Sequence, residues 1–239
     1  MKDEIFHFQQ FDIHQGRAAM KVGTDSDLLG ALCAGGSRIL DIGTGTGVLS
    51  LMLAQRCPEA QITAIEIDSD AVLDARQNFA LSPWSDRLHL EHISLQDYLL
   101  QHSVPQFDSV VCNPPFFHRS LHCPDAGRTR ARHTASLPFP TLVGGAYNLL
   151  LPGGSFSVCL PTEVLADFTQ LCLQTGFTPR RVLHIKTLPH KAPKRHVLVM
   201  NKGAHGAVQE EECCMRNADQ TRSDWYLQLM ADFLLCGPR

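Results

Sequence analysis

The middle of the chain alternates short β-rich runs with longer stretches of helical periodicity. Strands are predicted at 38–42, 61–67, 87–93, 107–112, 155–160, 182–187 and 196–200. Helices are predicted between them at 47–56, 69–80, 138–151 and 162–175, with Ser69 as the N-cap of the second. This alternation predicts an α/β fold: a doubly wound, mostly parallel seven-stranded sheet with helices on both faces and an antiparallel last strand. Ligands of such sheets bind where the strands end.

Composition limits what kind of protein this is. The chain has 239 residues, of which 44% are hydrophobic and 19% charged, so it can bury the core of one large domain. No apolar run approaches the roughly 18 residues of a membrane span, and the start of the chain lacks a secretory h-region. The nine cysteines are odd in number and form no CxxC pair, which is typical of reduced thiols in the cytoplasm.

A glycine-rich loop follows the first predicted strand. It reads DIGTGTG, with Asp41 two residues before Gly43, and with Gly45 and Gly47 after Thr44. Glycines permit a tight turn with positive φ and a close approach of a ligand to the backbone. The spacing differs from the GxGxxG of dinucleotide sites, although such a site and a plain structural turn remain alternatives. Glu66 ends the second strand, where a carboxylate can accept hydrogen bonds from ribose hydroxyls.

These residues resemble the S-adenosylmethionine (AdoMet) site of class I methyltransferases. The resemblance extends the predicted site along the strand ends to Ile67 and Asp68, although Asp68 can instead serve as the N-terminal acid of the next helix. Class I enzymes often place an acid after the third strand to meet the adenine of the cofactor. Here that position holds Ser94, followed by Leu95, and Asp97 is either a substitute or a helix-start acid.

The tetrapeptide Asn113-Pro114-Pro115-Phe116 directly follows the fourth strand. Two prolines remove two backbone donors and stiffen the chain. They hold the Asn113 side-chain oxygen and the Pro114 carbonyl as two acceptors for a planar NH₂ group, and Phe116 offers a face for stacking. This arrangement predicts methylation of an amino nitrogen, in which orientation supplies most of the rate acceleration. The alternative is a structural turn.

DIGTGTG, IEID and NPPF, in this order, resemble the amino-methyltransferases of the NPPY type. The upstream segment GRAAMKVGTDSDLL narrows the resemblance to the bacterial tRNA (adenine-N6)-methyltransferases that act on the adenine at position 37 of valine tRNA. The resemblance implies a Rossmann-like class I fold, AdoMet as cofactor and tRNA as partner. It also implies that the cofactor site includes part of the upstream segment, namely Lys21, Gly23, Thr24 and Asp25.

Two basic stretches are candidates for binding the RNA backbone. One lies at 116–134, directly after the tetrapeptide, and the other lies at 168–209 and includes the loop between the last two strands. The candidate contacts are Arg119, Arg128, Arg130, Arg132 and His133 in the first stretch, and Lys191, Lys194 and Arg195 in the second. His118, His122, Cys123 and His133 also raise the question of zinc. Their spacing lacks the two paired ligand motifs of zinc sites, so we expect no metal.

The expected organisation has three parts. Residues 1–37 contribute to the cofactor site, 38–205 form the methyltransferase domain, and 206–239 form an acidic linker with an amphipathic helix. That helix is expected to dock on the domain of a monomer, with dimerisation as the alternative. Two other activities remain open: protein glutamine N5-methylation, whose enzymes usually carry an N-terminal helical domain, and rRNA guanine-N2 methylation. A further alternative is a non-catalytic module that binds AdoMet or RNA.

Overall fold

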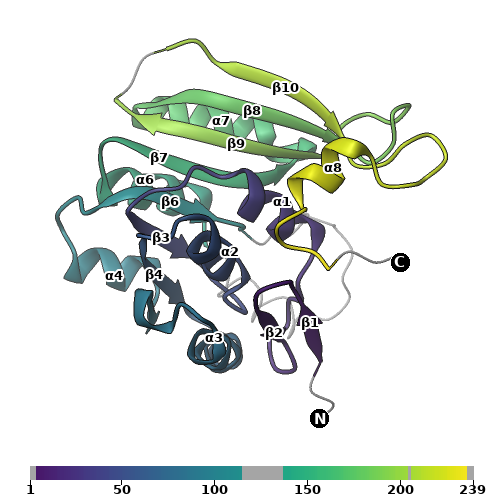
Figure 1. Cartoon of the computed structure of the whole chain (residues 1–239). Coiled ribbons are helices and arrows are strands. Elements are labelled where there is room, and N and C mark those ends of the chain that lie inside the picture. Colours follow the sequence, from purple (N-terminus) through teal and green to yellow (C-terminus); the bar gives the residue numbers. More distant parts are fainter. Residues whose placement is uncertain (1–3, 115–136, 204–205, 236–239) are drawn as a thin grey trace, which may run out of the picture.

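The computed structural model describes residues 4–114, 137–203 and 206–235. Eight strands form one sheet in the order β10-β8-β9-β7-β6-β3-β4-β5 (Figure 1). The strands of the sheet are β3 (Arg38–Ile42), β4 (Gln61–Glu66), β5 (Leu88–His92), β6 (Phe107–Cys112), β7 (Leu150–Pro161), β8 (Phe177–Lys186), β9 (Arg195–Lys202) and β10 (Gln209–Cys214). This confirms the predicted α/β architecture, with one strand more than expected.

The direction of the strands decides which loops share an edge. Strand β9 runs antiparallel to both of its neighbours, β7 and β8, whereas every other neighbouring pair is parallel. The loops that follow all strands except β9 therefore lie at one carboxyl edge, and β9 begins there. The prediction of an antiparallel last methyltransferase strand is confirmed.

Helices cover both faces of the sheet and define two apolar clusters. They are α1 (Thr24–Leu32), α2 (Val48–Arg56), α3 (Ser69–Leu81), α4 (Leu95–Gln101), α6 (Phe139–Leu149), α7 (Thr162–Thr175) and the short η1 (Ser85–Arg87). Alternate side chains of a strand point to opposite faces. Ile39 of β3 accordingly packs in the cluster with α1 and α2, and Leu40 in the cluster with α4, α6 and α7. No helix among the described residues is long and apolar enough to span a bilayer.

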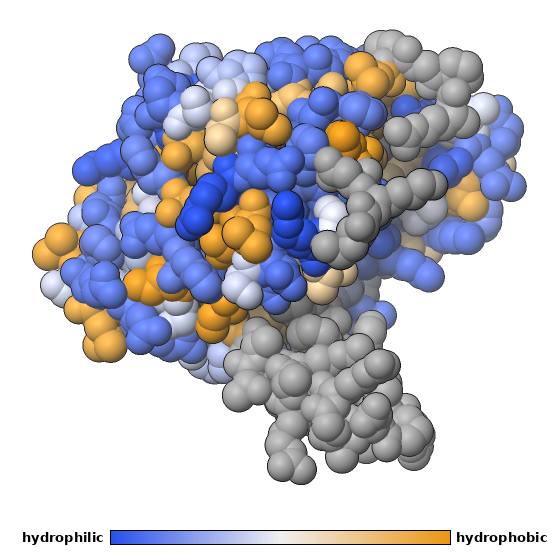
Figure 2. All heavy atoms as spheres, turned by 90° about the horizontal axis from the view of Figure 1, so that it is seen from below, coloured by the Kyte–Doolittle hydropathy of each residue, from blue (hydrophilic) through white to orange (hydrophobic). Residues whose placement is uncertain are grey.

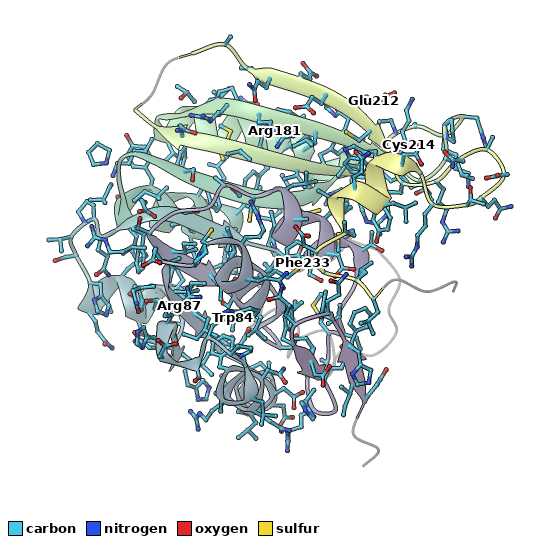
Figure 3. All side chains as sticks on the ribbon, in the orientation of Figure 1. Trp84, Arg87, Arg181, Glu212, Cys214 and Phe233 are labelled. Atoms are coloured by element: carbon cyan, nitrogen blue, oxygen red, sulfur yellow. The ribbon has the colours of Figure 1, made fainter. Side chains whose placement is uncertain are left out.

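The acidic run of residues 210–212 is exposed, as predicted, but it forms an edge strand rather than a linker. Each glutamate of β10 pairs with a basic side chain of β8. Glu210 meets His184 (2.8 Å), Glu211 meets Arg181 (3.1 Å) and Glu212 meets Lys186 (2.5 Å). Arg181 and Glu212 are labelled in Figure 3. Opposite charges on adjacent strands explain why this polar segment pairs although its side chains bury little surface.

The two ends of the chain meet on the face that carries α1 and α2. The hairpin of β1 (Ile5–His7) and β2 (Asp12–His14) precedes the sheet, and α8 (Asp224–Leu229) follows it. Phe8 forms an isolated antiparallel bridge with Leu234. The last helix is shorter than the periodicity predicted, since Phe233 and Leu234 lie beyond its end. Phe233 is nonetheless buried (Figure 3), because the turn after α8 folds back onto the core.

Candidate active site

Three predicted site residues stand side by side at the carboxyl edge. Ile42 of β3 pairs with Ile65 of β4 and with Cys112 of β6. The next residues along the three strands are Gly43, Glu66 and Asn113. Since neighbouring strands lie about 4.8 Å apart, the glycine loop is flanked by the carboxylate on one side and the asparagine on the other. The structure thus brings both motifs to one place.

The glycine loop needs its glycines for backbone conformation. Gly43, Gly45 and Gly47 have φ of 70°, 59° and 85°, in the left-handed region that other residues rarely adopt. A Cβ at Gly47 would lie 2.5 Å from the ring of Phe79, whereas a Cβ at Gly43 or Gly45 would meet no atom within 4 Å. The first two glycines therefore border open space, and the third packs against α3.

Glu66 fixes the loop through its carboxylate. Oε2 accepts a hydrogen bond from the Gly45 N–H (2.8 Å), and Oε1 accepts from the N–H groups of Ile67 (2.8 Å) and Asp68 (2.9 Å). A carboxylate oxygen has room for two acceptor bonds. Oε2 thus keeps capacity for one further donor at the open side of the loop, as a ribose hydroxyl requires.

Asp41 is fully buried and is hydrogen-bonded to the glycine loop. Its Oδ2 accepts hydrogen bonds from the hydroxyls of Thr44 (2.6 Å) and Ser50 (2.8 Å). Its Oδ1 has no partner among the described residues. Burial raises the pKa of this carboxyl to about 6, and the two hydroxyls lower it in part. Asp41 therefore ties Thr44 to α2 and becomes fully charged only above that pH.

Asn113 presents an unused acceptor. Its side-chain Oδ1 is buried and has no hydrogen-bond partner among the described residues. Pro114, which follows, is buried as well. A buried acceptor without a partner costs about 1–3 kcal/mol, so a donor that reaches it from a ligand recovers that free energy. Pro115 and Phe116 lie outside the described residues.

The residues that follow β4 and β5 mainly start helices. The N-cap of α3 is Asp68, whose side chain accepts from the Ala71 N–H (2.8 Å), so the prediction of Ser69 is wrong. Ser94 caps α4: it accepts from the Asp97 N–H (3.0 Å) and donates to the Asp97 carboxylate (2.6 Å). Asp97 is thus a helix-start acid. The exposed Ile67 and the buried Leu95 flank the same edge.

The upstream segment reaches the sheet through α1. Gly23 is the N-cap of α1, and Thr24 and Asp25 form its first turn. Asp25 pairs with Arg195 at the start of β9, so this segment is held at the carboxyl edge. The Lys21 ammonium lies elsewhere: it donates to the Gln15 carbonyl and is 3.4 Å from the Glu4 carboxylate. Lys21 thus contacts the N-terminal hairpin.

Two buried polar residues of α3 organise the site and were missed in the sequence. Asp74 accepts from the backbone N–H groups of Arg17 (2.9 Å) and Ala18 (2.8 Å), and from the Arg17 guanidinium (2.8 Å). The Asn78 amide donates to the carbonyls of Thr46 in the glycine loop and His14 in β2. Their spacing of four residues on the buried face of a helix was the available signal.

Some basic side chains of the second stretch form ion pairs, and others have no ion-pair partner among the described residues. Arg181 and Lys186 pair with β10, and Arg195 pairs with Asp25. Lys191 and Lys194 are exposed in the loop after β8, at the carboxyl edge, and have no ion-pair partner among the described residues. Figure 1 shows this loop projecting at the right of the sheet.

The first basic stretch lies outside the described residues, and so do the histidines and the cysteine considered for zinc. Its candidate contacts were Arg119, Arg128, Arg130, Arg132 and His133. Within residues 4–114, 137–203 and 206–235, the structure contains no group of three or more His, Cys, Asp or Glu side chains that could hold a metal ion.

Comparisons with known proteins agree with this geometry. The family model "Methyltransferase small domain" matches residues 19–160. A tRNA1(Val) (adenine(37)-N6)-methyltransferase of Bacteroides thetaiotaomicron is 40% identical to this chain, over 98% of the chain and 99% of that protein. The chain belongs to the tRNA1(Val) (adenine(37)-N6)-methyltransferase family. A member from Tolumonas auensis is 39% identical to this chain, over 98% of the chain and 98% of that protein.

Two solved structures share the fold of the present chain. A predicted O-methyltransferase from Agrobacterium tumefaciens superposes with a TM-score of 0.70 at 20% identity, over 87% of this chain and 96% of that one. A 16S rRNA N2 methyltransferase from T. thermophilus, solved with AdoMet and guanosine, gives a TM-score of 0.56 at 23% identity, over 83% of this chain and 50% of that one. Both likenesses establish the class I methyltransferase fold alone.

The residues present fit AdoMet, the methyl donor of this family. Open space borders Gly43 and Gly45, Glu66 keeps an acceptor site beside it, and Asn113 ends the opposite strand with an unpaired oxygen. A ribose needs an acceptor for its hydroxyls, and a sulfonium cation needs no phosphate-binding loop. The donor set contains carboxylates and backbone rather than basic side chains, which suits this cation.

Proposed function

We propose that this protein is the AdoMet-dependent enzyme that methylates N6 of adenine 37 in tRNA1(Val). The observation that carries the proposal is the position of Asn113, one strand from the glycine loop and with a free side-chain oxygen. The family supplies the identity of the substrate, since relatives of matching length bear this activity in their names. AdoMet supplies an electrophilic methyl group when it is bound.

The chain's contribution to catalysis is orientation of the amino group. The Asn113 side-chain oxygen and the Pro114 carbonyl each accept one N–H of the adenine amino group. Hydrogen bonds in this geometry localise the nitrogen lone pair and aim it at the methyl carbon. Holding two reactants in line lowers the activation free energy by about 7–11 kcal/mol. The nitrogen then loses a proton, and the exocyclic amine needs no strong base for this.

The cofactor-binding roles follow from the geometry at the strand ends. Glu66 would accept from the ribose hydroxyls, and Asp41 would hold the glycine loop through Thr44. The remaining contacts that we propose lie around these two, from the first turn of α1 to the helix starts after β4 and β5: Gly23, Thr24, Asp25, Ile67, Asp68, Ser94 and Leu95. Lys21 joins the site only if its ammonium leaves Glu4, 3.4 Å away.

The RNA would approach the carboxyl edge. The target base must leave its stack to reach Asn113, as for every enzyme that modifies a base. Lys191 and Lys194 are placed to bind backbone phosphates, because both are exposed and unpaired among the described residues. Phe116 and the arginines of the first stretch remain proposed contacts on the basis of the sequence. We place the enzyme in the cytoplasm as a monomer, with tRNA as its partner.

The product of methylation tests the proposal. The purified protein is incubated with AdoMet labelled in the methyl group and with total tRNA, and the digested nucleosides are separated. We expect label in N6-methyladenosine and loss of the signal after ribonuclease treatment. Label in N2-methylguanosine would indicate the rRNA-type activity. Label that survives ribonuclease and lies on glutamine would indicate protein methylation, and no label would support a non-catalytic module.

A further inference from the structure

A cavity of about 350 Å³ lies where the two ends of the chain meet α1. Three segments distant in sequence line it: β1, residues 22–27 at the start of α1, and residues 222–235, which include α8. The lining residues are Phe6, His7, Val22, Gly23, Thr24, Asp27, Arg222, Tyr226, Leu234 and Leu235. Among the described residues, the glycine loop and Asn113 do not line this cavity, whereas Gly23 and Thr24 do, so it adjoins the proposed cofactor site at the start of α1.

Asp27 is the chemically unusual group in this cavity. Its side chain is only 7% exposed, and its Oδ1 has no hydrogen-bond partner among the described residues. Burial, and then the charge of Asp25, raise the pKa of Asp27 to about 7. A carboxyl held between its two protonation states can accept hydrogen bonds or donate one. A carboxyl kept this way without a partner needs an explanation, which a bound polar group would supply.

The other walls of the cavity suit a flat ring. Phe6, Tyr226 and Leu234 supply aromatic and aliphatic surface. The Arg222 guanidinium lies over the Tyr226 ring, 5.9 Å from its centroid, and brings a positive charge to the mouth. Tyr226 and Asp27 line the same cavity, and burial and then the Asp27 charge raise the pKa of the Tyr226 phenol. Asp27 can thus meet the polar edge of a ring, and Arg222 can meet a phosphate.

The place of the cavity relates it to the RNA. Thr24 and Asp27 belong to the same helix start as Asp25, which pairs with Arg195 at the carboxyl edge. The turn that follows β10 also ends at this edge, at Ser223, which donates to the Cys214 carbonyl. Cys214 is labelled in Figure 3 at the end of β10. The cavity thus lies near the edge at which RNA would deliver a base to Asn113.

We propose that the cavity binds a second, unpaired nucleobase of the substrate loop, whose hydrogen-bonding edge meets Asp27 and whose ring packs against Tyr226. The adjoining phosphate would lie near Arg222. The proposal rests on the proposed function, since it takes the RNA as the substrate. It adds a specificity site: the enzyme would read a neighbour of the methylated adenine as well as the adenine itself.

The test uses the full-length protein and the anticodon stem-loop of tRNA1(Val), with a set of stem-loops that each lack one loop base. Dissociation constants are measured by fluorescence anisotropy with the demethylated cofactor present. With the wild-type protein, loss of one base other than the target should weaken binding about tenfold. With Tyr226→Ala, the intact stem-loop should bind about tenfold more weakly, and removal of that same base should cost less than about twofold.

Asp27→Asn is the second variant, and its asparagine side chain is nearly equal in size to aspartate. Asp86→Asn on η1 is its matched control. Asp27→Asn should reduce the loss of affinity caused by removal of that base, whereas Asp86→Asn should keep the wild-type profile. Wild-type profiles in both cavity variants would overturn the proposal. Methylation of the intact stem-loop by the wild-type protein is measured in parallel. Its absence would contradict the proposed function, and its presence with unchanged profiles would contradict the cavity site alone.

Discussion

At the scale of single residues, the site combines groups that are held by hydrogen bonds with buried oxygens that have no partner among the described residues. Glu66 uses three backbone donors to close the glycine loop and keeps a free acceptor position. Asn113 and Asp41 each leave one buried oxygen without a partner among the described residues. Such groups lower stability, so their presence at one edge of the sheet marks it as a place for ligands.

Glu66→Gln tests the carboxylate directly. A glutamine keeps one acceptor oxygen but turns an NH₂ group toward backbone donors, so it cannot hold Gly45 and Ile67 together. We expect the affinity for the demethylated cofactor, measured by calorimetry, to fall roughly 10- to 100-fold. Glu91→Gln on the neighbouring β5 is the control and should bind normally. Equal affinities of both variants would remove Glu66 from the site.

Asp27→Asn should stabilise the protein in a pH-dependent manner. The folded pKa of about 7 lies above the unfolded value of 3.8, so stability from this group is present below pH 4 and lost as the pH rises to 7. Asparagine avoids burying a charge. The melting temperature of the variant should therefore exceed that of the wild type at pH 8, by an amount equivalent to a few kcal/mol, and the gain should shrink toward pH 5. A constant difference would contradict this account.

At the scale of elements, the sequence predicted the central strands and helices well. The strand at 107–112 and the helix at 162–175 have the predicted bounds, because a buried apolar run and a regular amphipathic pattern are local signals. Strand β10 was not predicted, since its three consecutive glutamates pair with Arg181, His184 and Lys186 of the distant strand β8. That partner set is non-local. The Asp27 cavity was missed for the same reason, because its walls come from both ends of the chain.

His184 and His196 add a polar chain below the loop after β8. Thr162 donates its hydroxyl to the Pro193 carbonyl (2.8 Å), so it accepts from His196 Nε2 (2.9 Å). Burial lowers the pKa of His196 to about 4, and its Nδ1 lies 2.7 Å from His184 Nδ1. His184 Nε2 lies 2.8 Å from the Glu210 carboxylate. The loop that carries Lys191 is thus connected through its base to β10.

Charge reversal on β10 tests this connection. The triple variant Glu210→Lys, Glu211→Lys and Glu212→Lys replaces three attractive pairs by three repulsive ones. Exposed pairs contribute about 0–1 kcal/mol each, so we expect the free energy of unfolding to fall by roughly 1–3 kcal/mol at low salt, and less at high salt. Urea unfolding measures it, and Glu59→Lys, at an exposed site away from β10, is the control. No loss of stability would show that β10 does not depend on these pairs.

At the scale of the whole molecule, one edge of one sheet gathers the function. The loops after β3, β4, β6 and β8 share it, and both chain ends reach it through α1 and α8 (Figure 1). The face seen in Figure 2 shows hydrophobic residues interspersed among hydrophilic ones. The site residues of β3, β4 and β6 were predictable because the carboxyl ends of parallel strands must meet. Arg195 was predicted to bind RNA, and its pairing with Asp25 could not be seen in the sequence.

Lys191→Ala combined with Lys194→Ala tests the RNA-binding edge. Removing two phosphate contacts should weaken tRNA binding and reduce the slope of log affinity against log salt by about 1.5. Affinity for the demethylated cofactor should not change, since both lysines lie apart from the glycine loop. The control is Arg38→Ala with Arg76→Ala, which removes two exposed charges away from this edge. Equal salt slopes in both double variants would place the RNA elsewhere.

In the proposed reaction, Asn113 orients the amino group of adenine 37 beside the glycine loop. The most direct measurement compares the wild-type protein and Asn113→Ala in single-turnover methylation of tRNA1(Val), with mass spectrometry of the product. We predict N6-methyladenosine at position 37 with the wild type. For Asn113→Ala we predict a rate lower by at least about 100-fold, with cofactor affinity largely retained. A near wild-type rate in Asn113→Ala would contradict the account.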